Sequence, residues 1–325
     1  MTYDENTINQ IEEVLIRIIL ITNTLSAVGA TLMILTYFKF KELQTFAFRI
    51  VFYLNVSDLI LALSNMLLVK KDFNNDDPIL CLIQSYLINA SQLSSIIWTA
   101  IIAFILYQSC IKNQNEQSFN ICGYLFIGFC IPFSISIYPF FTHDYGFAGI
   151  SCWIKEDIKH PVRSTIVRYI NFYIPLMLII LYNSSVYIFI ICKLYGISQQ
   201  QTKFIYKMIS YPLILIICWI FTAFNKTYEE IQDQQQIWLL YLSKALSGLM
   251  GFFNYLGYGF TPQVRDQCAR YCCKRNSKSV SVELELKNQQ SLDTSQNTEE
   301  IKSRNSVNSQ RDSVQGELSF IAELY

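Results

Sequence analysis

The sequence has few of the residues that build metal and catalytic sites. It contains only two histidines, His143 and His160, and its ten cysteines lack metal-ligand spacing, so we expect no metal. The 25 basic and 25 acidic residues leave a net charge of +0, which is uninformative, but no basic cluster of the phosphate-binding kind is present. No nucleophile–base set or phosphate loop is recognisable either. The sequence therefore predicts no enzymatic activity, no cofactor and no nucleic-acid partner.

What the sequence does contain is apolar residues, which make up 52% of the chain. Seven mostly apolar stretches reach about 20 residues, the length that crosses a lipid bilayer as a helix. They are 14–38, 46–69, 79–109, 121–141, 166–194, 206–224 and 237–260. Because backbone polar groups must be paired in lipid, these stretches predict helices, and they are too long for barrel strands. The expected fold is an all-α membrane protein with a seven-transmembrane helix bundle.

The basic residues near the helix ends predict the orientation in the membrane. With the N-terminus outside, more Lys and Arg residues fall on the cytoplasmic side, as the positive-inside rule requires. Cys81 and Cys152 then lie outside, where disulfides persist, and Asn225 begins an outer N-glycosylation sequon. The adjacent Cys272 and Cys273 lie inside, where palmitoylation occurs. We expect a multi-pass protein of the plasma membrane with a cytoplasmic C-terminus.

Composition divides the chain into four regions. Residues 1–13 are a polar extracellular N-terminus, and residues 14–262 hold the seven helices. Residues 263–275 predict an amphipathic helix on the inner membrane surface, because four apolar residues share one face. These are Val264, Cys268, Tyr271 and Cys272. Residues 276–325 are rich in polar residues and predict a disordered cytoplasmic tail, whose serines are candidate sites for a kinase and an arrestin-like partner.

Polar residues inside the predicted spans mark candidate switch sites, because they are unfavourable in lipid unless paired. Asp58 lies near the middle of the second span, and its expected partners are Asn254 and Ser247 of the seventh, directly or through water or a cation. The cluster is either a switch or a polar knot that fixes helix packing. Pro212 permits a kink in the sixth span, and we assign Trp219 of the same span to the switch with it.

Basic residues also gather at the expected outer rim. Arg168 begins the fifth span, Lys226 follows the sixth and Lys244 lies in the seventh. Together they would attract an anionic small-molecule ligand, although lipid anchoring and snorkelling are the alternatives. Lys244 is also a weak candidate for a retinal Schiff base, because it lies further out than such a lysine usually does. Four neighbours complete the expected ligand site, namely Trp153, Lys155, Trp238 and Tyr241.

Several short motifs occur in an order typical of one receptor family. They are Cys81 and Trp98-Thr99, Cys152-Trp153-Ile154, Arg168-Tyr169, Phe172-Tyr173-Ile174-Pro175, Lys207-Met208-Ile209-Ser210-Tyr211-Pro212-Leu213, Cys218-Trp219-Ile220-Phe221, Asn225-Lys226 and Gly251-Phe252. On these residues the chain resembles the cyclic-AMP-receptor-like (class E) G protein-coupled receptors, and more distantly the secretin and adhesion group. The third span ends Ile105-Leu106-Tyr107-Gln108 without an Asp-Arg-Tyr triplet, which counts against rhodopsin-type receptors and not against this family.

The resemblance implies a receptor domain at 14–262 that binds an extracellular ligand and activates a heterotrimeric G protein. Cyclic AMP is the family's best-known agonist. The resemblance also implies a disulfide between Cys81 and Cys152, with Trp153 as an aromatic wall of the ligand mouth. Candidate contacts of the G protein are Tyr107, Lys112, Lys193, Lys203 and Lys207. The alternative is a seven-helix transporter or channel, which would need a polar path across the whole membrane.

Overall fold

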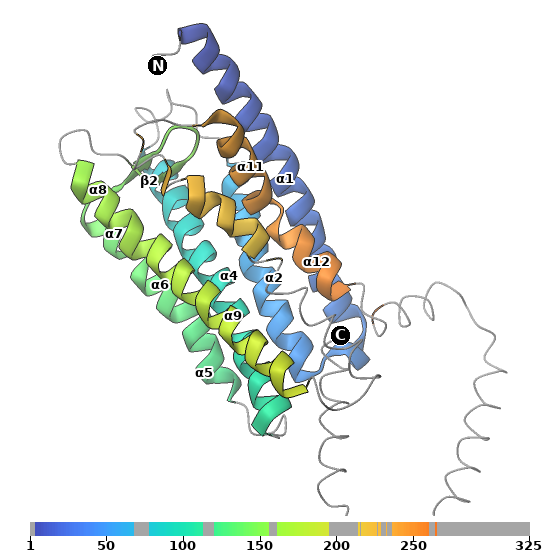
Figure 1. Cartoon of the computed structure of the whole chain (residues 1–325). Helices are drawn as coiled ribbons and strands as arrows, with labels where there is room; N and C mark the ends of the chain where they lie inside the picture. The colour runs from blue at the N-terminus through green and yellow to red at the C-terminus, as the bar shows by residue number, and fades with distance from the viewer. Residues whose placement is uncertain are drawn as a thin grey trace, which may run out of the picture.

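The computed structural model describes residues 4–67, 78–112, 120–155, 161–194, 214, 216–225, 227–228, 232, 236–259 and 264. These residues form an elongated helical bundle with a small hairpin at the end that also holds the N-terminus (Figure 1). Its helices are α1 (Glu5–Lys39), η1 (Lys41–Leu43), α2 (Phe46–Met66), α4 (Pro78–Lys112), α5 (Ile121–Leu125), η3 (Phe126–Cys130), α6 (Ile131–Ile135), α7 (Tyr138–Phe141), α8 (Pro161–Arg168), η4 (Tyr169–Tyr173), α9 (Ile174–Leu194), α11 (Ile237–Gly248) and α12 (Met250–Gly259). The strands of the hairpin are β1 (Tyr145–Phe147) and β2 (Cys152–Ile154).

Within the described residues, five helices are long and apolar enough to cross a membrane. They are Asn6–Lys39, Phe48–Met66, Ile79–Gln108, Ile121–Phe141 and Val162–Lys193. These match the first five predicted stretches, so the helical membrane fold is confirmed. Of the sixth stretch the structure describes a shorter helix, Ile216–Asn225, while Pro212 lies outside the described residues. A count of seven crossings therefore stays a prediction.

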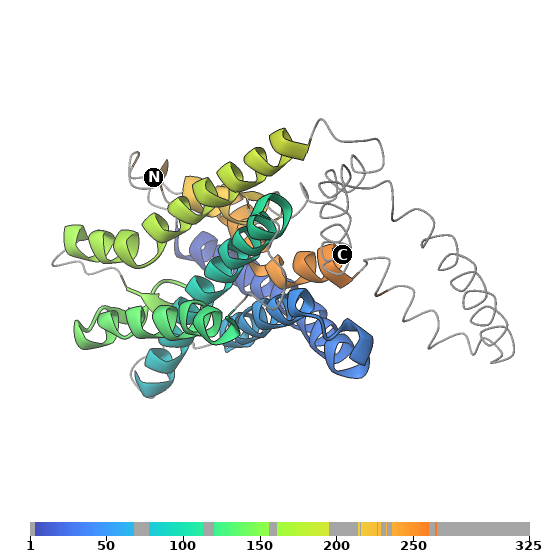
Figure 2. The ribbon, with the colours of Figure 1, turned by 90° about the horizontal axis from the view of Figure 1, so that it is seen from below.

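The α4 helix is the centre of the bundle. Its membrane-length window is 67% buried, whereas the windows of 121–141 and 162–193 are 17% and 22% buried. Seen from below, α4 (teal) passes between α9 (yellow-green) and the blue helices α1 and α2 (Figure 2), and it contacts α2, α9 and α6. Side chains of α4 therefore meet partners from both sides of the molecule, as the contacts of Gln84, Ser94 and Ser95 described below show.

Two predicted boundaries differ in the structure. The first helix begins at Glu5 and not at residue 14, because nothing in residues 5–13 interrupts a helix, neither proline nor glycine. The predicted helix 237–260 is divided into α11 and α12 by a turn at Leu249. Beside this turn, the backbone N–H of Gly251 donates to Ser26 Oγ of α1 over 3.0 Å. The polar contact with α1 therefore accompanies the interruption of the helix.

Two prolines follow wide π-helical turns. The turn η3 precedes Pro132 and η4 precedes Pro175. Proline has no backbone N–H, so the carbonyl four residues earlier loses its helical donor. For Pro132 that carbonyl belongs to Gly128, and it accepts a hydrogen bond from Ser94 Oγ of α4 over 2.6 Å. The proline thus allows the peripheral helix to bond directly to α4.

The hairpin was not expected in the all-α prediction. Its strands are antiparallel, with Tyr145 opposite Ile154 and Phe147 opposite Cys152. Tyr145 is buried, and its hydroxyl donates to the Ser136 carbonyl over 2.7 Å. Burial raises the pKa of Tyr145, which keeps this hydroxyl protonated as a donor. These contacts seat the hairpin on the end of the bundle.

Candidate ligand cavity and signalling core

A cavity of about 440 Å³ lies at the hairpin end of the bundle. Its walls come from α1, α4, the hairpin tip, η4, the helix 216–225 and α11, with Asn65 from α2. The volume falls within the roughly 300–1,000 Å³ of small-molecule sites. The structure therefore supplies a partly open site built from segments far apart in the sequence.

Part of the predicted ligand set lines this cavity. Trp153, Arg168 and Lys244 do so, and three other predicted residues join them, namely Trp219, Ser247 and Asn225. Trp238 and Tyr241 of α11 are not among the lining residues, and the Trp238 side chain is 61% exposed. Lys155 is not among them either, because its aliphatic stem packs over Gly146 of the facing strand. Lys226 lies outside the described residues.

Asn225 is only 4% exposed and faces the cavity. Attachment of a glycan requires an asparagine side chain that reaches solvent. The buried position disfavours the predicted glycosylation, and lining the cavity is the role that we retain for this residue.

Arg168 has two functions at the cavity. Its Nε donates to the Ile154 carbonyl over 3.0 Å, which ties strand β2 to the end of α8, and the residue also lines the cavity. The side chain is 4% exposed, whereas Lys244 is exposed. The two predicted cations therefore share one site, one of them fixed by the fold and the other in contact with solvent.

An aromatic wall connects the hairpin with the sixth-span helix. Trp153 meets Phe172 edge-on with ring centroids 5.9 Å apart, and Phe172 packs against Trp219 at 5.1 Å. All three rings line the cavity. The structure thus agrees with the expectation of an aromatic wall at Trp153 and extends it with Phe172, which the sequence analysis placed only in a family motif.

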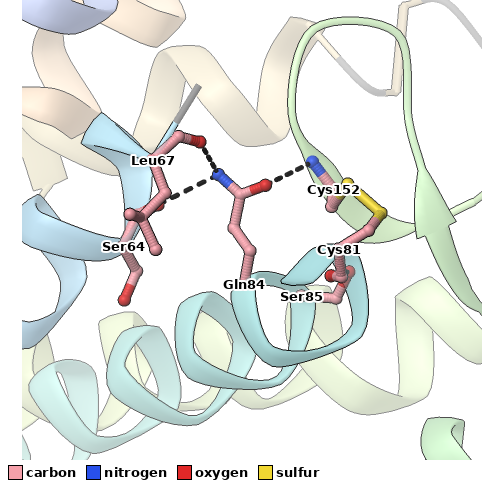
Figure 3. The surroundings of a disulfide bond; sticks show 6 residues. All are labelled: Ser64, Leu67, Cys81, Gln84, Ser85 and Cys152. Atoms are coloured by element: carbon pink, nitrogen blue, oxygen red, sulfur yellow. Dashed lines mark hydrogen bonds between the residues drawn. A yellow bond between two sulfur atoms is a disulfide. The ribbon is translucent and has the colours of Figure 1, made fainter. Parts of the chain in front are cut away.

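The predicted disulfide is present between Cys81 and Cys152, whose Cα atoms are 5.3 Å apart. Gln84, one turn further along α4, reinforces it (Figure 3). The Gln84 amide nitrogen donates to the carbonyls of Ser64, over 3.0 Å, and Leu67, while its oxygen accepts from the Cys152 N–H over 3.1 Å. One fully buried side chain therefore joins α4, the end of α2 and the hairpin.

Asp58 forms the polar core below the cavity. Its two carboxylate oxygens accept from Asn254 Nδ2 over 2.7 Å and from Ser95 Oγ over 2.6 Å. Asn254 was predicted correctly, but Ser247 is not a partner of Asp58. The Ser247 hydroxyl instead bonds back to the Ser243 carbonyl over 2.8 Å, and the residue faces the cavity, because the break after α11 separates it from the α12 face that carries Asn254.

The cavity and the polar core are in contact through Met250. Trp219 Nε1 donates to the Met250 sulfur over 3.0 Å, and Ser95 Oγ lies 3.9 Å from the same sulfur. Since Ser95 also bonds Asp58, a continuous path runs from a ring that lines the cavity to the buried carboxylate. Neither Met250 nor Ser95 was among the predicted site residues, although the third span is visibly rich in serine.

The opposite end of the bundle holds the described candidates for G protein contact. Tyr107 of α4 packs against Phe189 of α9 with centroids 5.8 Å apart, and Lys193 Nζ lies 5.9 Å from the same ring. Lys112 is the last residue of α4, so it belongs to this end. The other predicted G protein contacts, Lys203 and Lys207, lie outside the described residues. The predicted palmitoylation sites, Cys272 and Cys273, and the predicted tail 276–325 lie outside them as well. Of 263–275, only Val264 is described, as buried and helical.

Comparison with known proteins places this architecture in a family. The profile described as slime mold cyclic AMP receptor matches residues 6–305. The chain belongs to this family. G-protein coupled receptor 1 of Arabidopsis thaliana is 30% identical over 260 residues, which cover 75% of this chain and 77% of the relative. Cyclic AMP receptor-like protein A of Dictyostelium discoideum is 27% identical over 252 residues, 76% of this chain and 64% of the relative.

Membership of the slime mold cyclic AMP receptor family establishes the general class. The chain is a receptor and not an enzyme, and it is a multi-pass membrane protein of the G protein-coupled kind. A G protein and an extracellular ligand are the partners that this class implies. The alternative of a transporter or channel receives no support from these relatives.

Proposed function

We propose that this chain is a cell-surface receptor whose outer cavity binds a small molecule with an anionic group, and whose inner end activates a heterotrimeric G protein. The N-terminus and the hairpin face outward, and the tail 276–325 lies in the cytoplasm, where a kinase and an arrestin-like protein bind it. The observation that carries the proposal is the cavity, which combines Arg168, Lys244 and three aromatic rings at the disulfide-bonded end.

The two cations support an anionic ligand. Arg168 is held in place by its bond to the hairpin, so its guanidinium is pre-organised for an oxygen anion. Lys244 reaches solvent and would attract such a ligand before it enters. Cyclic AMP, the ligand named for several relatives, combines a phosphate with a flat ring that suits the aromatic wall, and it is the first compound to test.

The path from Trp219 to Asp58 supports a mechanism of transmission. A ligand seated on the Trp219 ring would change its contact with Met250, and that change would reach the Ser95–Asp58–Asn254 group at the junction of α2, α4 and α12. An agonist must bind the active arrangement more tightly than the resting one. The hydrogen bonds among Ser95, Asp58 and Asn254 are what would differ between the active and the resting arrangement.

The experiment is a G protein activation assay in membranes, with cyclic AMP, other small anions and phenylalanine, a zwitterion, as probes. We expect Lys244→Gln to raise the half-maximal agonist concentration about tenfold or more, since a charge-assisted contact contributes roughly 1.5–3 kcal/mol. Lys155→Gln is the matched control, because this outer lysine does not line the cavity. Equal responses of Lys244→Gln and wild type, or no activation by any probe that carries an anionic group, would reject the proposal.

A further inference from the structure

Three polar groups of the cavity residues have no partner within the described part of the chain. The Glu12 carboxylate of α1 takes part in neither an ion pair nor a hydrogen bond. The Gln92 Oε1 and Trp153 Nε1 atoms are buried and unbonded. A buried polar atom without a partner destabilises a protein by about 1–3 kcal/mol, so such atoms are rare unless a ligand or water completes them.

Glu12 belongs to the part of α1 that precedes the predicted first span. Ile8, Ile11 and Leu15 line the cavity beside it, so the N-terminal turns of this helix form one wall of the site. The next residue, Glu13, does not line the cavity, because its carboxylate pairs with Arg17 at 2.5 Å and its side chain is 64% exposed. Two adjacent glutamates therefore differ in whether they face the ligand site.

The lining offers complementary groups for two charges of opposite sign. Glu12 and the Gln92 oxygen are acceptors only, and they suit the N–H donors of an ammonium group. Arg168, Lys244 and the Trp153 indole are donors, and they suit an oxygen anion. A purely anionic molecule would place its charge in a cavity that also holds an unpaired carboxylate, whose repulsion acts against binding.

We propose that the ligand is a compact zwitterion, with a protonated amine for Glu12 and Gln92, an anionic group for Arg168 and Lys244, and an aromatic or apolar body against the Trp153–Phe172–Trp219 wall. This inference rests on the proposed function and specifies its ligand class. Glu12 is then the residue that distinguishes a zwitterion from a simple anion of the same shape.

Three probes with a common phenyl ring separate these charge classes: phenylalanine, 3-phenylpropionate and 2-phenylethylamine. Their effect is measured as the thermal stabilisation of the full-length chain in detergent over a series of probe concentrations. A ligand at free concentration c that binds the folded state stabilises it by RT ln(1 + c/Kd), so the concentration dependence of Tm gives the affinity of each probe. We expect phenylalanine to bind at least tenfold more tightly than either single-charge probe. Glu12→Gln is expected to remove this advantage over 3-phenylpropionate, and Glu13→Gln is expected to retain it.

The result that overturns the inference is equal stabilisation by phenylalanine and 3-phenylpropionate, an equal effect of the two glutamate variants, or no stabilisation by phenylalanine. The assay involves no G protein, so its outcome is separate from that of the proposed function. Activation by simple anions with an unchanged Glu12→Gln response would retain the receptor function and reject the zwitterion. Selective binding of phenylalanine without any G protein activation would retain the zwitterionic ligand and reject the receptor function.

Discussion

The indole N–H of Trp219 donates to the sulfur of Met250 over 3.0 Å, and this bond is the point where the ligand cavity meets the polar core. Trp219 lines the cavity on one side, while Met250 lies 3.9 Å from the hydroxyl of Ser95 on the other. A thioether is a weak acceptor with a flexible side chain, so the contact is easily rearranged. A junction of this kind can transmit a change in the ring to Asp58 without moving a whole helix.

Met250→Leu tests this junction. Leucine nearly preserves the volume but removes the sulfur acceptor. The receptor arrangement in which Trp219 bonds Met250 in the wild type would then hold a buried, unpaired N–H, and it would be destabilised by about 1–3 kcal/mol. We expect basal G protein activation to change roughly fivefold or more at equal surface display. Met177→Leu is the control, because Met177 lies on an exposed face of α9. Unchanged basal and maximal responses in Met250→Leu would contradict a role in transmission.

Asp58→Asn tests the polar core itself. The two oxygens of Asp58 accept from Ser95 and Asn254, and an amide presents only one oxygen, so one of the two donors loses its partner. We expect a reduced agonist response, measured by G protein activation at equal surface display. Asp58→Asn combined with Asn254→Asp restores complementary donors and acceptors, and we expect it to recover part of the response. A normal response of Asp58→Asn alone would reduce the core to a packing role.

The long-range features of the fold were predictable because each depends on one strong property of the sequence. The membrane helices follow from apolar length, since no other element satisfies the backbone in lipid. The Cys81–Cys152 bond followed from the resemblance and agrees with the geometry. Asn254 was predicted as a partner of Asp58, because few polar residues of the seventh span can meet a buried carboxylate.

The missed features depend on helix rotation and on breaks, which the sequence does not define. The third span carries Gln84, Gln92 and Ser95 among other polar residues, and its sequence alone does not show which of them face α2, the hairpin or the cavity. Ser247 was assigned to the core because the break at Leu249 was not foreseen. Glu12 was assigned to a polar terminus, although α1 continues through it and brings it to the cavity.

Removal of the disulfide with Cys81→Ala and Cys152→Ala should lower the stability by about 2–5 kcal/mol, because the bond closes a long loop. Gln84→Leu should have a smaller effect of about 1–3 kcal/mol, since it leaves the Cys152 N–H without its acceptor. Thermal unfolding in detergent measures both, and Cys122→Ser, at an exposed free cysteine, is the control. A Tm of Gln84→Leu equal to wild type would show that the hydrogen bonds of Gln84 add no stability to the attachment of the hairpin.

Gly128→Ala should destabilise the contact between the peripheral helix and α4. An added Cβ would lie 2.4 Å from the Trp98 ring, which is fully buried and has no room to retreat. Overpacking of this kind costs about 1–3 kcal/mol, and it should also disturb the bond from Ser94 to the Gly128 carbonyl. Gly123→Ala is the matched control in the same predicted span, because there an added Cβ meets no atom closer than 3.9 Å. The control should be neutral or more stable by up to about 1 kcal/mol, because alanine favours the helix. Equal Tm values for the two variants would mean that this helix does not pack on Trp98 as described.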